Sequence, residues 1–301
     1  MMSLDVRPIA VHLGAEIHGV DLGADLDDST VAAIRAALIE HKVVFFRDQT
    51  LDHEAHGRFA RRFGPVTPAH VVFGGVDATH PELYSVAKHR PAAQTHQQVA
   101  RRPWSGWHTD ITAAVNPPFA SILRGDTVPP VGGDTQWVDM AAVYSSLSPT
   151  LQAIAEPLWC RHRYRVGVDP EYRELVESSA LVSEHPMVTV HPESGERVLF
   201  VNPSFVEGIV GMAPSESRGL LELLYEQSLQ SRFTVRFRWE PGSVAFWDNR
   251  STMHLAPIDH FDTEFDRQFY RITLVGEPLT SVDGRRSRPI SGDPIRPVEE
   301  A

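Results

Sequence analysis

The chain has 301 residues, of which 42% are hydrophobic and 22% are charged, and this composition is typical of a globular protein with a substantial core. The formal net charge of −11 argues against nucleic acid or an anionic membrane surface as partner, because both require a basic footprint. The single cysteine, Cys160, excludes an intrachain disulfide. No apolar run approaches the ~18 residues of a membrane span, and the first residues lack the pattern of a secretory signal. We therefore expect a cytoplasmic protein.

Three helices are predicted from helical spacing and capping residues. The first covers residues 28–41, where Asp28 or Ser29 can cap it. Residues 43–46 follow as a short buried strand, and residues 53–63 form the second helix. Pro214 suits the first turn of the third helix.

Short strand-like runs dominate the rest of the chain. Residues 233–239 alternate apolar and polar side chains, Pro241 and Gly242 supply a turn, and residues 243–247 are apolar again, which predicts a hairpin. Further strands are predicted at residues 120–123, 135–138, 158–164, 188–190, 198–201 and 268–275.

Many short strands punctuated by glycine and proline, with a few helices outside them, indicate a mainly β fold with flanking helices. The core expected is a double-stranded β-helix of the jelly-roll or cupin type. Because no repeat or linker divides the chain, we expect a single domain over residues 1–301. The polar, proline-containing stretch at residues 88–106 is predicted to be a lid loop, and the tail from about Arg285 an exposed arm.

The pair His108 and Asp110 is the strongest candidate for chemistry. Two residues apart on a strand, both side chains leave the same face and can converge on one metal ion. A second histidine would complete a site of two imidazoles and one carboxylate that leaves three positions open, and His254 is the candidate.

Other histidines stand near acidic residues, since chance alone produces such pairs. The pair His260 and Asp262 lies in an acidic stretch that is typical of a solvated loop. The pairs His80 with Glu82 and His191 with Glu193 enclose a proline, which indicates a turn instead of a strand.

Arg267 and Arg271 lie four apart on the last clear strand, so they share a face with their roots about 13 Å apart. They can serve two different anions, because an arginine directed into a barrel requires an anionic partner and its planar fork suits a carboxylate or sulfonate. The alternative is a pair of structural salt bridges, for example with Asp262 or Glu264. The opposite face carries Tyr270, Ile272 and Leu274, which we expect to pack against the outer layer.

The order of motifs along the chain resembles that of the taurine dioxygenase family, which also includes alkylsulfatases and phenoxyalkanoate dioxygenases. The resemblance covers nearly the whole chain. The segments that carry it are GAEIHGVDL from Gly14, HKVVFFRDQ from His41, WHTD from Trp107, GGDTQW from Gly132, WDNR from Trp247 with His254 after it, and YRITLVGE from Tyr270.

The resemblance implies roles for these residues. His108, Asp110 and His254 would hold iron(II), and Thr135 with Arg267 would hold the distal carboxylate of 2-oxoglutarate, which is consumed together with oxygen. Arg271 matches the arginine that binds the substrate anion. Positions that line the substrate site in the family correspond here to His70, Phe73, Trp104, Ile111 and Phe205.

Two of these positions bear on the substrate. Trp104 stands where the taurine enzyme has a small polar amide, and Ala113 replaces an aromatic residue. These departures argue against taurine itself and leave sulfonates, sulfate esters and carboxylates open as substrates. His70 could instead be an ordinary loop or core histidine. Arg101 and Arg102 could add positive potential at the mouth of the site or form solvated charge pairs.

The activity implied is oxidative decarboxylation of 2-oxoglutarate coupled to hydroxylation of a small anionic substrate, most simply an alkyl sulfonate or sulfate ester, with release of sulfite or sulfate plus an aldehyde. Asp110 disfavours halogenation, because related halogenases lack this carboxylate. One alternative is an aryloxyalkanoate or other carboxylate as substrate. From another class, a metal-binding cupin module or a zinc hydrolase would use the same ligands, but neither needs Thr135 and Arg267. The family suggests a homodimer or homotetramer.

Overall fold

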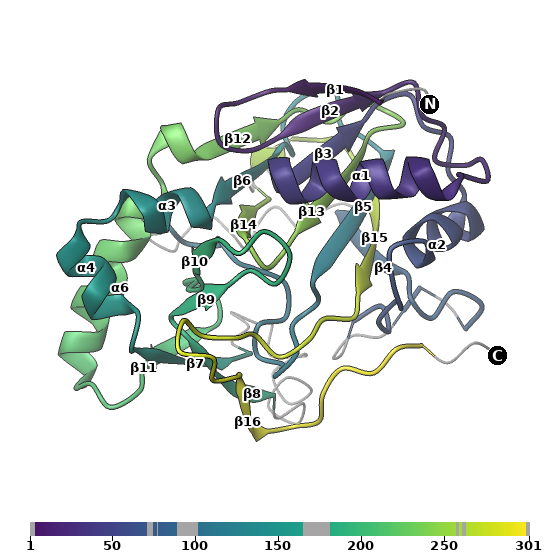
Figure 1. Cartoon of the computed structure of the whole chain (residues 1–301). Helices are drawn as coiled ribbons and strands as arrows, with labels where there is room; N and C mark the ends of the chain where they lie inside the picture. The colour runs from purple at the N-terminus through teal and green to yellow at the C-terminus, as the bar shows by residue number, and fades with distance from the viewer. Residues whose placement is uncertain are drawn as a thin grey trace.

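The protein consists mainly of antiparallel β-sheets with helices at their margins, as the sequence predicted (Figure 1). The computed structural model describes residues 4–70, 75–76, 78–88, 102–164, 181–256, 259–260 and 263–298. Within these residues, no helix is long and apolar enough to cross a membrane.

A seven-stranded sheet forms the centre of the fold, with its strands in the order β1-β2-β3-β13-β5-β15-β4. Neighbouring strands are antiparallel except for β2 and β3, which are parallel. The bounds are β1 (Asp5–Pro8), β2 (Ala15–His18), β3 (Val43–Phe46), β4 (Tyr84–Lys88), β5 (Ala120–Thr127), β13 (Val244–Asp248) and β15 (Arg267–Leu274).

Three smaller antiparallel sheets have the strand orders β12-β6-β14, β11-β7-β8-β16 and β10-β9. Their strands are β6 (Thr135–Asp139), β7 (Trp159–Arg163), β8 (Val182–Pro186), β9 (Val188–Val190), β10 (Arg197–Leu199), β11 (Val206–Ile209), β12 (Thr234–Phe237), β14 (Thr252–Leu255) and β16 (Arg288–Ser291). The helices are α1 (Asp28–His41), α2 (His53–Arg61), α3 (Met140–Ser146), α4 (Pro149–Ala155) and α6 (Pro214–Ser228), and a 3-10 turn, η2 (Ser231–Phe233), precedes β12.

Helix α1 forms where the sequence predicted it. Its cap is Asp27, one residue before the predicted cap, and the Asp27 carboxylate accepts a hydrogen bond from the Thr30 N–H at 2.7 Å. Ile34 and Leu38 are buried against the seven-stranded sheet. The helix ends at Lys42, which adopts the left-handed conformation (φ 65°) and donates its N–H to the Leu38 carbonyl.

The seven-stranded sheet is covered on both faces, which follows from its continuous apolar strands. In β3 all four residues are buried, and they alternate in direction. Val44 and Phe46 face α1 and α2, and Val43 and Phe45 face the sheet of β12, β6 and β14. Phe45 stacks on Phe237 of β12 with 4.0 Å between ring centroids. Figure 1 shows α3, α4 and α6 grouped at one end, beside β6 and β10.

The predicted hairpin at residues 233–247 is wrong. The turn at Pro241 and Gly242 is present, but β12 pairs with β6 and β13 pairs with β3 and β5, so the two strands belong to different sheets. The inward side chains of the two strands meet across the sandwich, within one hydrophobic cluster, instead of side by side. A turn signal alone does not distinguish these two outcomes.

The tail from Arg285 is largely exposed, as expected, but it is held against the rest of the fold. Strand β16 pairs with β8 while most of its side chains face outward, which explains the polar composition. Ile295 is buried, and its backbone N–H and carbonyl form two hydrogen bonds with the Asn116 side chain, at 2.8 and 2.9 Å. Val298 then donates its N–H to the Val66 carbonyl.

Part of the predicted lid at residues 88–106 is described. Lys88 ends β4, and residues 103–106 form a turn. Arg102 is exposed and forms an ion pair with Glu222 of α6 at 2.9 Å. Residues 89–101, including Arg101, lie outside the described residues.

Candidate metal centre

Three side chains from distant parts of the chain converge at one point. His108 and His254 are joined through their backbones, since each donates its N–H to the carbonyl of the other, at 2.9 and 2.7 Å. The imidazole Nε2 atoms lie 4.0 Å (His108) and 3.9 Å (His254) from Asp110 Oδ1. All three ligand atoms are within 4.8 Å of one another, so together they could hold a metal ion. Asp110 itself begins a turn, and only His108 makes a strand-like bridge.

The two imidazoles are in the form that a metal requires. The His108 Nδ1 lies 2.9 Å from the Gly106 carbonyl, which can only accept, so Nδ1 carries the proton and Nε2 presents its lone pair. Burial lowers the pKa of His108 and holds the pKa of His254 well below its usual value. Both rings are therefore neutral at pH 7.

Asp110 is ionised although it is buried. Burial raises the pKa of this carboxyl, but the Arg271 guanidinium, the two histidines and a hydrogen bond from Ser121 together hold it below its usual range. Arg271 donates from Nη1 to Oδ1 at 2.5 Å, and the Ser121 hydroxyl donates to Oδ2 at 2.6 Å. The donor set is thus two neutral nitrogens and one carboxylate oxygen, which suits a divalent transition metal.

Arg267 forms a second cationic position on the same strand. It is 3% exposed, and among the residues that the structure describes its buried Nε has no hydrogen-bond partner. Burial lowers its pKa to about 10, although Asp259 acts in the opposite direction. A Cβ on Gly133 would lie 3.2 Å from this Nε, and Gly133 has φ +72°, so a larger residue would crowd the guanidinium and strain the backbone.

Thr135 belongs to the same neighbourhood as Arg267. Its hydroxyl accepts a hydrogen bond from the Trp239 indole at 2.9 Å. Trp239 contacts the Phe269 ring edge-on at 4.8 Å, and the Arg267 guanidinium lies 3.8 Å from the centre of that same ring. As predicted for the opposite face of the strand, Tyr270, Ile272 and Leu274 pack in the cluster below α1 and α2.

Aromatic residues surround Arg271. Its guanidinium lies 5.3 Å from the centre of the Tyr84 ring, which is its direct partner across β4 and β15. His70 is buried, and burial, reinforced by Arg271 and opposed by Asp110, lowers its pKa to about 3. The Tyr164 hydroxyl lies 3.1 Å from His70 Nε2. Tyr84 and Tyr164 were missed in the sequence, because strand register decides which residue lies opposite an arginine.

The remaining predicted substrate residues have different surroundings. Phe205 contacts the Tyr164 ring at 5.4 Å between centroids. Ile111 is buried in the same cluster as Phe205 and has φ +46°, a strained conformation for a β-branched residue. Trp104 packs on Tyr225 of α6, at 6.1 Å between ring centroids. Phe73 lies outside the described residues.

Known proteins are similar to this chain along nearly its whole length. The model of the family described as "Taurine catabolism dioxygenase TauD, TfdA family" matches residues 5–273. The chain belongs to this family. It is 41% identical over 300 residues to an alpha-ketoglutarate-dependent sulfate ester dioxygenase of Pseudomonas putida, with 95% of this chain and 94% of that protein covered. It is 38% identical over 302 residues to an alkylsulfatase of Acinetobacter baylyi, with 95% and 89% covered.

A solved structure is similar as well. In the crystal structure of a taurine dioxygenase from Burkholderia xenovorans, the chain has 54% sequence identity to this member of the family and superimposes on it with a TM-score of 0.86. The match covers 97% of this chain and 96% of that one.

Proposed function

We propose that this member of the TauD/TfdA family is an iron(II)- and 2-oxoglutarate-dependent dioxygenase that hydroxylates an alkyl sulfate ester or sulfonate. The observation that carries the proposal is the arrangement of two buried arginines, Arg267 and Arg271, on the strand beside the group of His108, Asp110 and His254. A metal module or a zinc hydrolase requires no second buried cation with an unsatisfied nitrogen. The sulfate ester and alkylsulfatase relatives support the substrate class.

His108 and His254 would bind the iron through Nε2, and Asp110 through Oδ1. The neutral imidazoles and the ionised carboxylate fit this role without a change of protonation. When bound, the iron supplies activation of oxygen, driven by oxidative decarboxylation of 2-oxoglutarate to succinate and carbon dioxide.

Arg267 and Thr135 would hold the distal carboxylate of 2-oxoglutarate. The Nε of Arg267, which has no hydrogen-bond partner within the described part of the chain, favours a carboxylate at this position, because a buried guanidinium is stabilised by an anion that matches its planar fork.

Arg271 would bind the sulfate or sulfonate group, with His70 and Phe205 on the walls of the substrate site. Because His70 is neutral, Arg271 is the residue that would supply positive charge to the substrate anion. Hydroxylation of the carbon next to the ester oxygen gives a hemiacetal ester, which breaks down to an aldehyde and sulfate. A sulfonate that is hydroxylated at the carbon bonded to sulfur releases sulfite in the same way.

The remaining expectations are part of the same proposal. We place the enzyme in the cytoplasm as a homodimer or homotetramer, and we take the seven-stranded sheet and the sheet of β12, β6 and β14 as the two halves of a double-stranded β-helix within one domain.

Succinate and sulfate formation test the proposal. The protein, loaded with iron(II) without oxygen, is given 2-oxoglutarate, air and a panel of alkyl sulfates, sulfonates and phenoxyalkanoates. Succinate that rises with an alkyl sulfate, in step with sulfate release, is the expected result. A phenol from a phenoxyalkanoate would move the substrate class to carboxylates, and no succinate with any compound would refute the dioxygenase.

A further inference from the structure

A chain of three buried hydrogen bonds leads from the protein core to the carboxylate of Asp110. The Trp247 indole donates to Asn249 Oδ1 at 2.9 Å, Asn249 Nδ2 donates to Ser121 Oγ at 2.8 Å, and Ser121 Oγ donates to Asp110 Oδ2 at 2.6 Å. Each of the four residues is at most 2% exposed. The links come from β13, from the turn after it, and from β5, which is the neighbour of β13.

The direction of every proton in this chain is fixed by its first member. An indole nitrogen can only donate, so the Asn249 side chain must turn its oxygen towards Trp247 and its amide nitrogen towards Ser121. The Ser121 oxygen then accepts from Asn249, and its own proton is left for Asp110. An ionised carboxylate can only accept, which closes the chain without ambiguity.

As a consequence, the two carboxylate oxygens of Asp110 have different partners. Oδ2 accepts from the Ser121 hydroxyl, and Oδ1 is turned towards both imidazole nitrogens, at 4.0 and 3.9 Å, while it also accepts from Arg271 Nη1 at 2.5 Å. A carboxylate held in this way presents one oxygen to a metal and not two.

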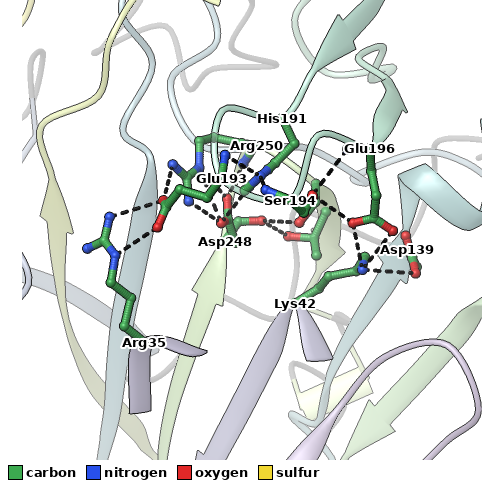
Figure 2. A network of polar contacts seen from close by, with 11 residues as sticks. Arg35, Lys42, Asp139, His191, Glu193, Ser194, Glu196, Asp248 and Arg250 are labelled. Carbon is green, nitrogen blue, oxygen red and sulfur yellow. Dashed lines mark hydrogen bonds and ion pairs between the residues drawn. The ribbon is translucent and has the colours of Figure 1, made fainter. Parts of the chain in front are cut away.

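The turn that carries Asn249 is itself held in place. Figure 2 shows the polar network around the preceding residue, Asp248. Its carboxylate accepts hydrogen bonds from His191 Nε2 at 3.0 Å and from Arg250 Nη2 at 2.5 Å. Glu193 extends the network by pairing with Arg250 at 2.8 Å and with Arg35 of α1, also at 2.8 Å.

Backbone hydrogen bonds complete the anchoring. Asp248 donates its N–H to the Lys42 carbonyl at 2.9 Å, and Asn249 donates its N–H to the Phe119 carbonyl at 2.8 Å. Asn249 is thus fixed by its main chain as well as its side chain, so it cannot follow Ser121 if the serine or the carboxylate rotates.

We propose that Ser121 and Asn249 are positioning residues of the metal centre, which keep Asp110 a one-oxygen ligand. This inference rests on the proposed function for the identity of the metal and of 2-oxoglutarate. Three protein ligands leave three coordination positions open. Rotation of Asp110 to bind through both oxygens would take one of the positions that 2-oxoglutarate and oxygen require.

Calorimetric titration under nitrogen tests the inference with cobalt(II), followed by 2-oxoglutarate. We expect Ser121→Ala to weaken cobalt binding by about 10- to 100-fold, the usual effect of removing a partner of a metal ligand. Asn249→Leu, which is close in size but cannot donate, should weaken it less, since the Ser121 hydroxyl remains. In the cobalt-saturated variants, 2-oxoglutarate should also bind more weakly than in the wild type.

The double variant separates positioning from general loss of structure. If Asn249 acts through Ser121, Asn249→Leu has a smaller effect on cobalt affinity in the Ser121→Ala background than alone. Ser228→Ala is the matched control, because Ser228 is fully buried and its hydroxyl donates to the Leu224 carbonyl in α6 at 2.8 Å. It should leave both titrations unchanged.

Wild-type affinities in both single variants, or additive effects in the double variant, would overturn the inference. Neither result depends on turnover. An absence of succinate from the wild-type enzyme would instead refute the proposed function, and cobalt affinity would still decide whether Ser121 and Asn249 position Asp110.

Discussion

Removal of the Arg271 side chain should separate the two reactions of the enzyme. Arg271 is 9% exposed and touches Asp110 through one nitrogen, which leaves the rest of its guanidinium for the substrate anion. Truncation of one partner in a buried, hydrogen-bonded charge pair costs about 2 to 5 kcal/mol. At about 1.4 kcal/mol for each factor of ten, Arg271→Ala should lower kcat/KM for the alkyl sulfate by roughly 30-fold to several thousand-fold.

The slow consumption of 2-oxoglutarate without substrate should change much less. That background reaction requires the metal ligands and Arg267. The substitution keeps these side chains but removes the hydrogen bond from Arg271 to Asp110 Oδ1, so cobalt affinity is measured as well. The assay measures succinate with and without the alkyl sulfate, together with sulfate release. Arg124→Ala is the control, because Arg124 is 6% exposed on β5 and pairs with Asp126 at 3.3 Å, away from the metal centre. Equal losses of both reactions in Arg271→Ala, with cobalt affinity unchanged, would refute its assignment to the substrate.

Four other substitutions or conditions give defined outcomes. His108→Ala should abolish cobalt binding and turnover while the circular dichroism spectrum is kept; full activity would remove His108 from the ligand set. Arg267→Ala should raise the KM for 2-oxoglutarate by at least about tenfold, as expected for the loss of a charged hydrogen bond, with cobalt affinity unchanged. A loss of affinity for both 2-oxoglutarate and cobalt would show a structural role. Ile295→Ala should lower the free energy of unfolding in urea by about 2 to 5 kcal/mol, because Ile295 is 7% exposed; a change below ~0.5 kcal/mol would show that the tail is not anchored there. Acid should destabilise the protein through buried histidines, since burial lowers the pKa of His56 to about 3 and of His185 to about 4. In the unfolded chain these histidines take up protons below their usual pKa of 6.5, whereas in the folded chain they stay neutral down to about pH 4 and 3. Their contribution to the free energy of unfolding is therefore complete above pH 6.5 and is lost as the pH falls from 6.5 towards 4 for His185 and 3 for His56. Within this pH range, each histidine lowers the free energy of unfolding by about 1.4 kcal/mol per pH unit. Equal urea midpoints at pH 7 and pH 5 would contradict this prediction.

Local signals predicted α1, α2, α6 and most strands, whereas α3 and α4 were missed. The spacing of Ile34 and Leu38 identified α1, and the apolar run at residues 43–46 identified β3. These features depend on neighbours within a few residues, so the sequence carries them directly. The other wrong predictions concern the pairing of segments that lie far apart in the sequence. The turn at Gly242 joins two sheets instead of closing a hairpin, and the polar tail contributes a strand through its backbone, which composition does not record.

The candidate site shows the same division. His108 and Asp110 were predicted from their spacing, and His254 from the resemblance of the surrounding motifs. Ser121 was missed because it lies inside an ordinary apolar strand, and only the pairing of β5 with β13 brings it next to Asn249. Tyr84 was missed for the equivalent reason on β4.

The contact between Asn116 and Ile295 sets when the loop after Asp110 can be secured during synthesis. The two residues are 179 positions apart, and chains emerge from the ribosome with the N-terminus first. His108 and Asp110 are made before His254, and the hydrogen bonds that secure the loop after Asp110 form only once Ile295 has been made. The first two ligands are therefore made well before their partner, and a chain released before Ile295 lacks the segment that secures their loop.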